Sequence, residues 1–252
     1  MKILLTLSYV GTNLCGYQVQ PTGRTVQGEL NLAAKALFGF DCDVTGCSRT
    51  DAGVHANTFC AAITKKGEDS IETSVDISRI PIAMNAHLPA DIAVREAKWI
   101  DSALHPRYDV KYKEYIYRIY NSQARSPFEE GRAWHIPQVF DASDLERMSL
   151  AAEKYIGKHD FSAFMASGST VSTTVRDVKY ASVAKVGDII EFRVAADGFL
   201  YNMVRIMTGT LVAVGQGRIS HEKIDEIIAS CDRKNAGVTA PAHGLYLNKV
   251  VY

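Results

Sequence analysis

The densest group of reactive side chains in this sequence is Gly46-Cys47-Ser48-Arg49-Thr50-Asp51-Ala52-Gly53-Val54-His55-Ala56. Asp51 is its single carboxylate, and a carboxylate that is held ionised and aimed acts as a nucleophile or general base. Arg49 lies two residues away, so in an extended segment both side chains share one face, where Arg49 pairs with Asp51 or binds a phosphate. From these residues alone two interpretations stay open, a loop that positions chemistry and a polar turn in which Gly53 supplies a positive φ.

Arg205 is the second candidate, because it is a lone charge within the apolar run Met203–Met207. At helical spacing it forms a narrow polar stripe with Asn202 and Gly209. The stripe either meets water or faces a cleft in which Arg205 pairs with a buried carboxylate. The sequence leaves both environments open.

Tyr115 is the third candidate and belongs to a cluster of tyrosines with Tyr112, Tyr117 and Tyr120. Tyrosines on strands usually pack against their neighbours. Interleaved with basic residues, they also suit a surface that stacks bases and binds phosphates. Residues 105–125 contain five Lys or Arg against two acids, a local excess of three positive charges.

Two other chemistries are possible at the same loop, and both fit the spacing poorly. Cys42, Cys47, His55 and Cys60 are close in sequence, but they lack the paired Cys-x₂₋₄-Cys spacing of a zinc site. Cys47 and His55 could form a thiol nucleophile and its base, yet spacing reveals no Asn or Asp to orient the base. Neither a Walker loop nor a dinucleotide fingerprint is present, so we expect no cofactor and no metal.

The bulk composition limits the class of protein. The chain has 252 residues, with 28 Lys and Arg against 28 Asp and Glu. A net charge of zero excludes a uniformly basic surface but permits a local basic cleft for nucleic acid. No run approaches the roughly 18 apolar residues that span a bilayer. Five cysteines and no export signal lead us to expect a cytoplasmic protein with reduced thiols and no membrane partner.

Hydrophobic periodicity predicts the elements that must position these residues. In the first half we expect strands at 2–10, 59–64 and about 92–99. Thr25 as N-cap and Gly39 as stop predict a helix between them. Asp76 could cap a short helix, and Pro81 must then lie in its first turn or break it.

The second half repeats this mixture of strands and helices. The expected strands are 111–120, 134–136 paired with it, 173–186, 188–196 with a hairpin turn at Gly187-Asp188, and 245–252. A capping box of Ser143 and Glu146 predicts a helix that ends before Gly157, an apolar helix covers about 202–214, and Ser220 caps another. The pattern predicts an α+β (mixed α/β) fold of two pseudo-duplicated halves, 1–104 and 105–252.

Ordered motifs along most of the chain resemble one family. Residues 46–56 are similar to the catalytic motif of the tRNA pseudouridine synthases of the TruA family. Further similar segments are 9–11, 16–21, 23–30, 85–89, 91–94, 115–121, 160–164, 198–205 and 241–245. Two positions depart from the family pattern, Ser48 where Gly is frequent and Tyr17 where Trp is usual. Neither departure removes a catalytic group.

The resemblance implies isomerisation of uridine to pseudouridine at tRNA positions 38, 39 and 40, without a cofactor. It implies that Asp51 is the nucleophile or base and that Arg205 pairs with it. It also implies that Tyr115 stacks on the uracil, while Arg49 and Arg24 contribute to substrate binding, Arg49 in the space left by the flipped base. The implied fold has two halves sharing a mainly antiparallel sheet flanked by helices, with the active-site cleft between them. The resemblance also implies a homodimer that binds one tRNA across both subunits.

Two rival functions remain. A paralogue with the same chemistry would modify another uridine or another RNA. A non-catalytic RNA-binding protein would keep the fold without the reaction, although Asp51, Tyr115 and Arg205 are all present. The sequence does not decide whether Asp51 attacks C1′, adds at C6 or removes a sugar proton.

Overall fold

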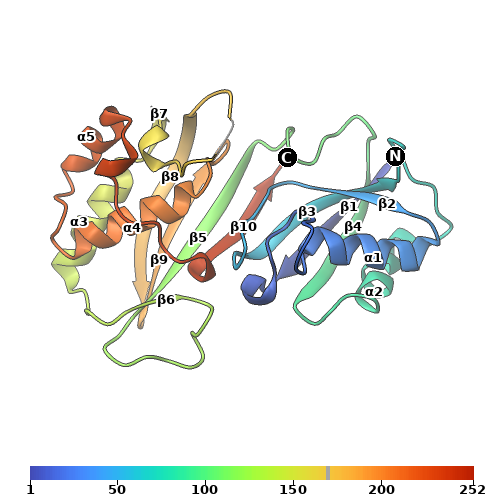
Figure 1. The fold of residues 1–252 in the computed structure, drawn as a ribbon, viewed down its shortest axis with the longest axis horizontal. Coiled ribbons are helices and arrows are strands. Elements are labelled where there is room, and N and C mark those ends of the chain that lie inside the picture. The colour runs from blue at the N-terminus through green and yellow to red at the C-terminus, as the bar shows by residue number, and fades with distance from the viewer. Residues whose placement is uncertain (169–170) are drawn as a thin grey trace. The chain divides into compact units, whose positions relative to one another are not determined.

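The computed structural model describes residues 1–168 and 171–252, and they form two compact units (Figure 1). The first unit is 1–111 with 246–252, and the second is 112–245. These bounds differ from the expected 1–104 and 105–252. Residues near 105–111 belong with the first unit because Lys111 N donates to Val251 O at 2.7 Å and the Tyr252 hydroxyl donates to Pro106 O at 2.7 Å.

The first unit contains a mainly antiparallel set of strands and two helices. Its strands are β1 (Lys2–Tyr9), β2 (Cys42–Gly46), β3 (His55–Lys65), β4 (Ile92–Ile100) and β10 (Leu245–Val251), and its helices are α1 (Val26–Phe38) and α2 (Ile80–Asn85). β1 is antiparallel to both β3 and β4, β2 is antiparallel to β3, and β10 is parallel to β3. Ile3, Leu5 and Leu7 on β1 are fully buried, so this strand lies in the core.

Both helices of the first unit follow the sequence signals. The Thr25 side chain accepts a hydrogen bond from Gly28 N at the start of α1, and Gly39 ends the helix with φ 79°. Pro81 lies in the first turn of α2, where a proline removes no helical hydrogen bond. The predicted caps of α1 and the position of Pro81 are confirmed.

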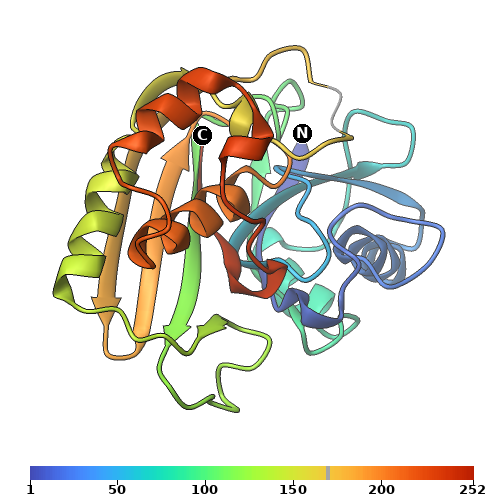
Figure 2. The same cartoon turned by 60° about the vertical axis from the view of Figure 1, so that its left-hand side comes forward.

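The second unit contains a strand meander and three helices (Figure 2). Its strands are β5 (Tyr112–Asn121), β6 (Trp134–Ile136), β7 (Gly157–Asp160), β8 (Val175–Val186) and β9 (Ile189–Ala196), and its helices are α3 (Ala142–Glu153), α4 (Met203–Gly215) and α5 (Lys223–Ser230). The order is β5-β9-β8-β7, all antiparallel, and β6 is parallel to β5. The α+β class and the β8–β9 hairpin are therefore confirmed.

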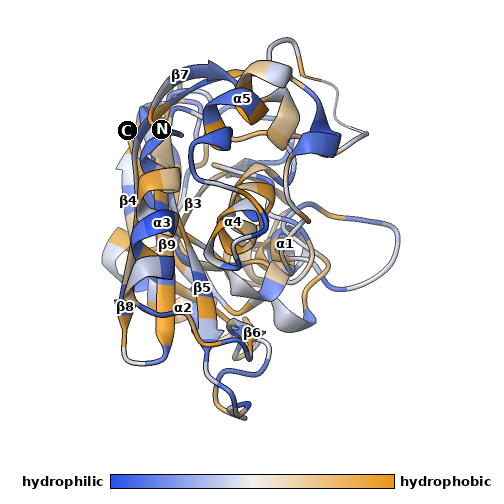
Figure 3. Ribbon diagram, turned by 90° about the vertical axis from the view of Figure 1, so that its left-hand side faces the viewer, coloured by the Kyte–Doolittle hydropathy of each residue, from blue (hydrophilic) through white to orange (hydrophobic). Residues whose placement is uncertain are grey.

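Helix α4 forms much of the core of this unit. Eleven of its thirteen residues are buried, and Figure 3 marks most of the helix as hydrophobic. It packs against α3 and β5. Tyr155, Phe164 and Phe192 add an aromatic cluster, with Tyr155 edge-on to Phe164 at 5.2 Å between ring centroids.

Two predicted caps are wrong. α3 begins at Ala142, and its capping box is Asp141 with Asp144 rather than Ser143 with Glu146. Asp141 and Asp144 form the capping box because the Asp141 carboxylate accepts from Asp144 N and the Asp144 carboxylate accepts from Asp141 N. α5 begins after Glu222, and Ser220 does not cap it.

Candidate active site

The Asp51 loop, residues 47–54, connects β2 to β3. It leaves the β2–β3 ladder at Cys47, whose N donates to Cys60 O at 2.8 Å and whose Sγ accepts from Cys60 N at 3.4 Å. It ends in a turn in which Val54 N donates to Asp51 O at 3.2 Å. Asp51 is half-buried at the start of this turn, and Gly53 supplies a positive φ of 81° within it.

The segment after β1 holds the Asp51 loop on both sides of the carboxylate. Tyr17 N donates to Thr50 O at 3.1 Å, and Gly53 N donates to Leu14 O at 3.2 Å. The Tyr9 hydroxyl also lies 2.7 Å from Thr50 Oγ1 in a buried hydrogen bond. The backbone is thus fixed at the residue before Asp51 and two residues after it. A loop fixed in this way can hold a catalytic carboxylate in one orientation.

Two glycines permit this close approach. A Cβ on Gly11 would lie 2.0 Å from Val54 O. A Cβ on Gly16 would lie 2.6 Å from Thr50 O, and Gly16 also has a φ of +84°. Any larger residue at either position would push the two segments apart.

Cys47 and His55 serve the loop structure. Cys47 is fully buried and paired with Cys60 as described above. His55 is 1% exposed; its Nδ1 accepts from Gly11 N at 2.9 Å, and its ring stacks on Tyr246 at 4.5 Å between centroids. Because Nδ1 is an acceptor, the proton of neutral His55 resides on Nε2. His55 therefore fastens the segment after β1 to the start of β3.

Arg49 and Arg24, both expected to bind substrate, have different surroundings. Arg49 is exposed on the Asp51 loop. Arg24 donates through Nε to Glu29 and through Nη2 to Asp91, each at 2.8 Å, and these hydrogen bonds raise its pKa. Two carboxylates thus offset the charge of Arg24. Of the two arginines, Arg49 is better placed to attract a phosphate.

Tyr115 lies on β5 in the second unit, opposite Val194 of β9. Its side chain is 7% exposed and meets Phe199 edge-on at 5.0 Å between centroids. Tyr117, on the same strand, donates its hydroxyl to Pro241 O at 2.7 Å, and burial raises its pKa. Phe199 thus packs against the ring of Tyr115.

Arg205 projects from the first turn of α4. Its Nε donates to Ala240 O at 2.7 Å, and its Nη1 donates to Asn202 Oδ1 at 2.7 Å. Ala240 N donates in return to Arg205 O at 3.1 Å. Residues 236–240 therefore lie against the polar stripe of α4 at Arg205 and Gly209.

Gly209 explains how residues 236–240 come so close to α4. A Cβ there would lie 1.8 Å from Val238 O. Gly237 contributes from the other side, with its N donating to Thr210 Oγ1 at 2.9 Å. Two glycines thus allow backbone to pack directly on the helix that presents Arg205.

The structure distributes the predicted site residues between the two units. Arg24, Arg49 and Asp51 belong to the first, and Tyr115 and Arg205 to the second. Sequence reasoning missed the supporting residues Tyr9, Thr50 and Ala240. The inward alternation of β1 and the family resemblance of residues 9–11 both included Tyr9. Ala240 gave no signal, because a backbone acceptor such as Ala240 O leaves no residue pattern.

Two further features concern residues 1–168 and 171–252, the part of the chain that the structure describes. In that part of the chain, no three His, Cys, Asp or Glu side chains gather so as to hold a metal ion. None of the helices described there has both the length and the apolar character needed to cross a bilayer.

The chain is similar to known proteins over its whole length. A family model described as tRNA pseudouridine synthase matches residues 151–252. A tRNA pseudouridine synthase A of Acetivibrio thermocellus is 43% identical over 252 residues, which cover 100% of this chain and 99% of the relative. One of Moorella thermoacetica is 44% identical, covering 98% of both chains. The match to one chain of the solved Cbf5–Nop10–Gar1 complex covers 97% of this chain and 57% of that chain, with a TM-score of 0.37 and 11% sequence identity.

Proposed function

This chain belongs to the tRNA pseudouridine synthase A family, and on that premise we propose that it isomerises uridine to pseudouridine at positions 38, 39 and 40 of tRNA. The N1–C1′ bond of the uridine breaks, the uracil turns while bound, and C5 bonds to C1′. C5 loses its proton and N1 gains one, so no electrons or groups are transferred. The reaction therefore needs no cofactor.

The observation that carries this proposal is the two-sided anchoring of the Asp51 loop. Tyr17 N and the Tyr9 hydroxyl hold Thr50, and Leu14 O holds Gly53. A catalytic nucleophile or general base must keep its orientation while the uracil departs and turns. A loop whose backbone is fixed on both sides meets this need. We assign Asp51 this role.

The remaining roles are those that the resemblance implies. Arg205 keeps Asp51 ionised and oriented, because a neighbouring cation stabilises the charged form of a carboxylate. Tyr115 stacks on the uracil, and Arg49 enters the space that the flipped nucleotide leaves. The edge contact with Phe199 supports a defined ring position for Tyr115, and the exposure of Arg49 suits contact with RNA. Arg24 makes a smaller contribution because Glu29 and Asp91 offset its charge.

We also propose that the enzyme is a cytoplasmic homodimer whose two subunits contact one tRNA. The sequence carries no net charge, so the positive surface that meets phosphate must be local.

The test compares wild type with Asp51→Ala by mapping pseudouridine in tRNA and by tritium release from tRNA labelled at uridine C5. We expect Asp51→Ala to bind tRNA normally and to release no tritium. Asp41→Ala is the matched control, since Asp41 is an exposed carboxylate paired with Lys35. Release near the wild-type rate from Asp51→Ala would remove Asp51 from the mechanism. Pseudouridine missing at sites other than 38–40 in a deletion strain would favour the paralogue instead.

A thiol or zinc enzyme predicts a different result. Cys47→Ser, or a chelator, would then abolish turnover. Because Cys47 is buried against Cys60 in the Asp51 loop, we expect Cys47→Ser to keep releasing tritium from the labelled tRNA.

A further inference from the structure

Asn202, the residue that precedes α4, has an unusual backbone conformation. Its φ of 59° and ψ of 10° lie in the left-handed region. Among residues 1–168 and 171–252, Cys231 is the only other non-glycine residue with a positive φ. Residues other than glycine enter this region at a cost, and those that are held there cluster at functional sites. Glycine would adopt the same backbone more easily, so the backbone alone does not account for an asparagine here.

The Asn202 side chain does not cap the helix that it precedes. An asparagine at this position ordinarily accepts a hydrogen bond from a backbone N–H of the first turn. The Asn202 side chain makes no such bond to α4, all of which the structure describes. Its Oδ1 instead accepts from Nη1 of Arg205 at 2.7 Å. The left-handed turn thus brings a side-chain acceptor to the guanidinium.

Hydrogen bonds hold the backbone on both sides of this turn. Before it, Ala166 N donates to Tyr201 O at 3.0 Å. After it, Ile206 N donates to Asn202 O at 3.0 Å, which is the first helical bond of α4. The amide that contacts Arg205 is therefore carried by a backbone that is itself held in place.

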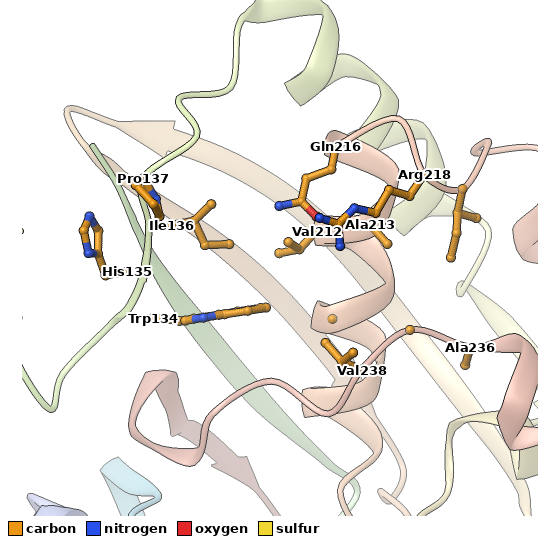
Figure 4. A pocket seen from close by; sticks show the side chains of 13 residues that line it. Trp134, His135, Ile136, Pro137, Val212, Ala213, Gln216, Arg218, Ala236 and Val238 are labelled. Atoms are coloured by element: carbon orange, nitrogen blue, oxygen red, sulfur yellow. The ribbon is translucent and has the colours of Figure 1, made fainter. Parts of the chain in front are cut away.

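A backbone carbonyl binds the same guanidinium at a second nitrogen. Nε of Arg205 donates to Ala240 O at 2.7 Å, and Ala240 N donates to Arg205 O at 3.1 Å. Figure 4 shows Val238 of the same segment beside α4. The guanidinium is planar and rigid, so hydrogen bonds at both Nε and Nη1 define its plane. Asn202 and Ala240 together orient Arg205.

Both of these acceptors are uncharged, in contrast to the partners of Arg24. Arg24 donates to the carboxylates of Glu29 and Asp91, each at 2.8 Å. A carboxylate offsets the charge of the guanidinium that it orients, whereas an amide or carbonyl oxygen orients a guanidinium and leaves its charge in place. The two acceptors of Arg205 described above therefore orient it without neutralising it.

We propose that Asn202 is a positioning residue for the isomerisation, whose neutral amide orients the guanidinium of Arg205 and leaves its charge to Asp51. The inference rests on the function proposed above, because Asn202 acts through the pairing of Arg205 with Asp51. That pairing keeps Asp51 ionised and oriented. A negatively charged acceptor at position 202 would compete with Asp51 for the same guanidinium.

A purely structural role at the start of α4 is the competing explanation, and it predicts a different effect of aspartate. Aspartate has nearly the shape of asparagine, tolerates the left-handed region and binds a guanidinium through a charge-assisted hydrogen bond. A structural role alone predicts that Asn202→Asp is as stable and as active as wild type. The positioning role predicts that Asn202→Asp stays folded and loses activity.

The test measures kcat and KM by tritium release from tRNA labelled at uridine C5, and the melting temperature by circular dichroism. We expect Asn202→Asp to match or exceed the wild-type melting temperature, to lower kcat roughly tenfold or more, and to change the KM for tRNA less than about twofold. Asn202→Gly suits the backbone but removes the acceptor, so it should lower kcat by about threefold to tenfold. Cys231→Asp is the matched control, because it places the same charge at the other left-handed residue, which is exposed, and should keep the wild-type kcat.

The outcomes separate this inference from the proposed activity. A wild-type kcat in Asn202→Asp would overturn the positioning role and leave the isomerisation standing, and so would a loss of kcat that only follows a lower melting temperature. A raised KM with an unchanged kcat would assign Asn202 to RNA binding and overturn the inference. A wild-type protein that releases no tritium would overturn the proposed function and this inference with it.

Discussion

The buried hydrogen bond between Tyr9 and Thr50 offers the sharpest test of how the Asp51 loop is held. Tyr9→Phe removes the hydroxyl 2.7 Å from Thr50 Oγ1, and Thr50→Val removes the other partner. The two side chains are 4% and 8% exposed, so water cannot readily replace the lost bond. Leaving one buried hydroxyl without this partner should lower the free energy of unfolding by about 1–3 kcal/mol.

The double variant shows whether the Tyr9 and Thr50 hydroxyls stabilise the fold through their mutual hydrogen bond or independently of each other. Removing both hydroxyls leaves two apolar groups of nearly the original shape, which can be close to neutral. We therefore expect Tyr9→Phe/Thr50→Val to cost less than the sum of the singles, with a coupling free energy of about 1 kcal/mol or more. Urea unfolding followed by circular dichroism gives the four values, and exposed Tyr108→Phe is the matched control.

The same cycle has a catalytic consequence, because Thr50 is bonded directly to Asp51 in the chain. A loss of about 1 kcal/mol of transition-state positioning slows turnover roughly fivefold, and a larger displacement slows it further. We expect Tyr9→Phe to lower kcat while the KM for tRNA changes little. Single costs that add up to the double within about 0.3 kcal/mol, together with wild-type kcat in Tyr9→Phe, would refute this account of the loop.

Two further predictions concern the second unit. Gly209→Ala should lower the melting temperature and kcat together, because its Cβ would lie 1.8 Å from Val238 O and displace the segment that bonds Arg205. An unchanged melting temperature for Gly209→Ala would contradict this packing. Hydrogen bonds from Asp144 N and Ser143 hold the pKa of Asp141 below its usual value of about 4, so its stabilisation is present above that pH and is lost as the pH falls through the folded pKa. Asp141→Asn keeps an acceptor but does not titrate, and should therefore show a smaller drop in melting temperature between pH 7 and pH 3 than wild type; an equal drop would remove Asp141 from the acid response.

Sequence patterns predicted the strands that carry their own periodicity and missed those that do not. The alternation of residues 2–10 and the apolar stripe of α1 were sufficient, because both elements bury one regular face. β2 was missed, since five residues with buried Cys42, Val44 and Gly46 make a short and atypical alternation. β7, Gly157–Asp160, is largely polar and forms a strand through its ladder with β8. Such strands are specified by their partners.

The candidate site also contains features that the sequence predicted and features that it did not. Residue type and spacing identified the Asp51 loop, and the family resemblance assigned its role together with Tyr115 and Arg205. Two of the supports of that loop are backbone groups of Leu14 and Tyr17. A backbone N–H or C=O is present at almost every residue, so no sequence pattern distinguishes the ones that hold a catalytic loop.

Residues 236–241 illustrate how backbone acceptors contact side chains near the proposed site residues. Ala240 O accepts from Arg205 Nε on α4, and the next residue, Pro241, accepts from the hydroxyl of Tyr117 on β5. One short segment therefore contacts both the guanidinium of Arg205 and, through Tyr117, the strand that carries Tyr115. The segment lies this close to α4 because Gly209 has no side chain. Gly209, part of the polar stripe of α4, thereby permits the approach of the segment that accepts hydrogen bonds from both Arg205 and Tyr117.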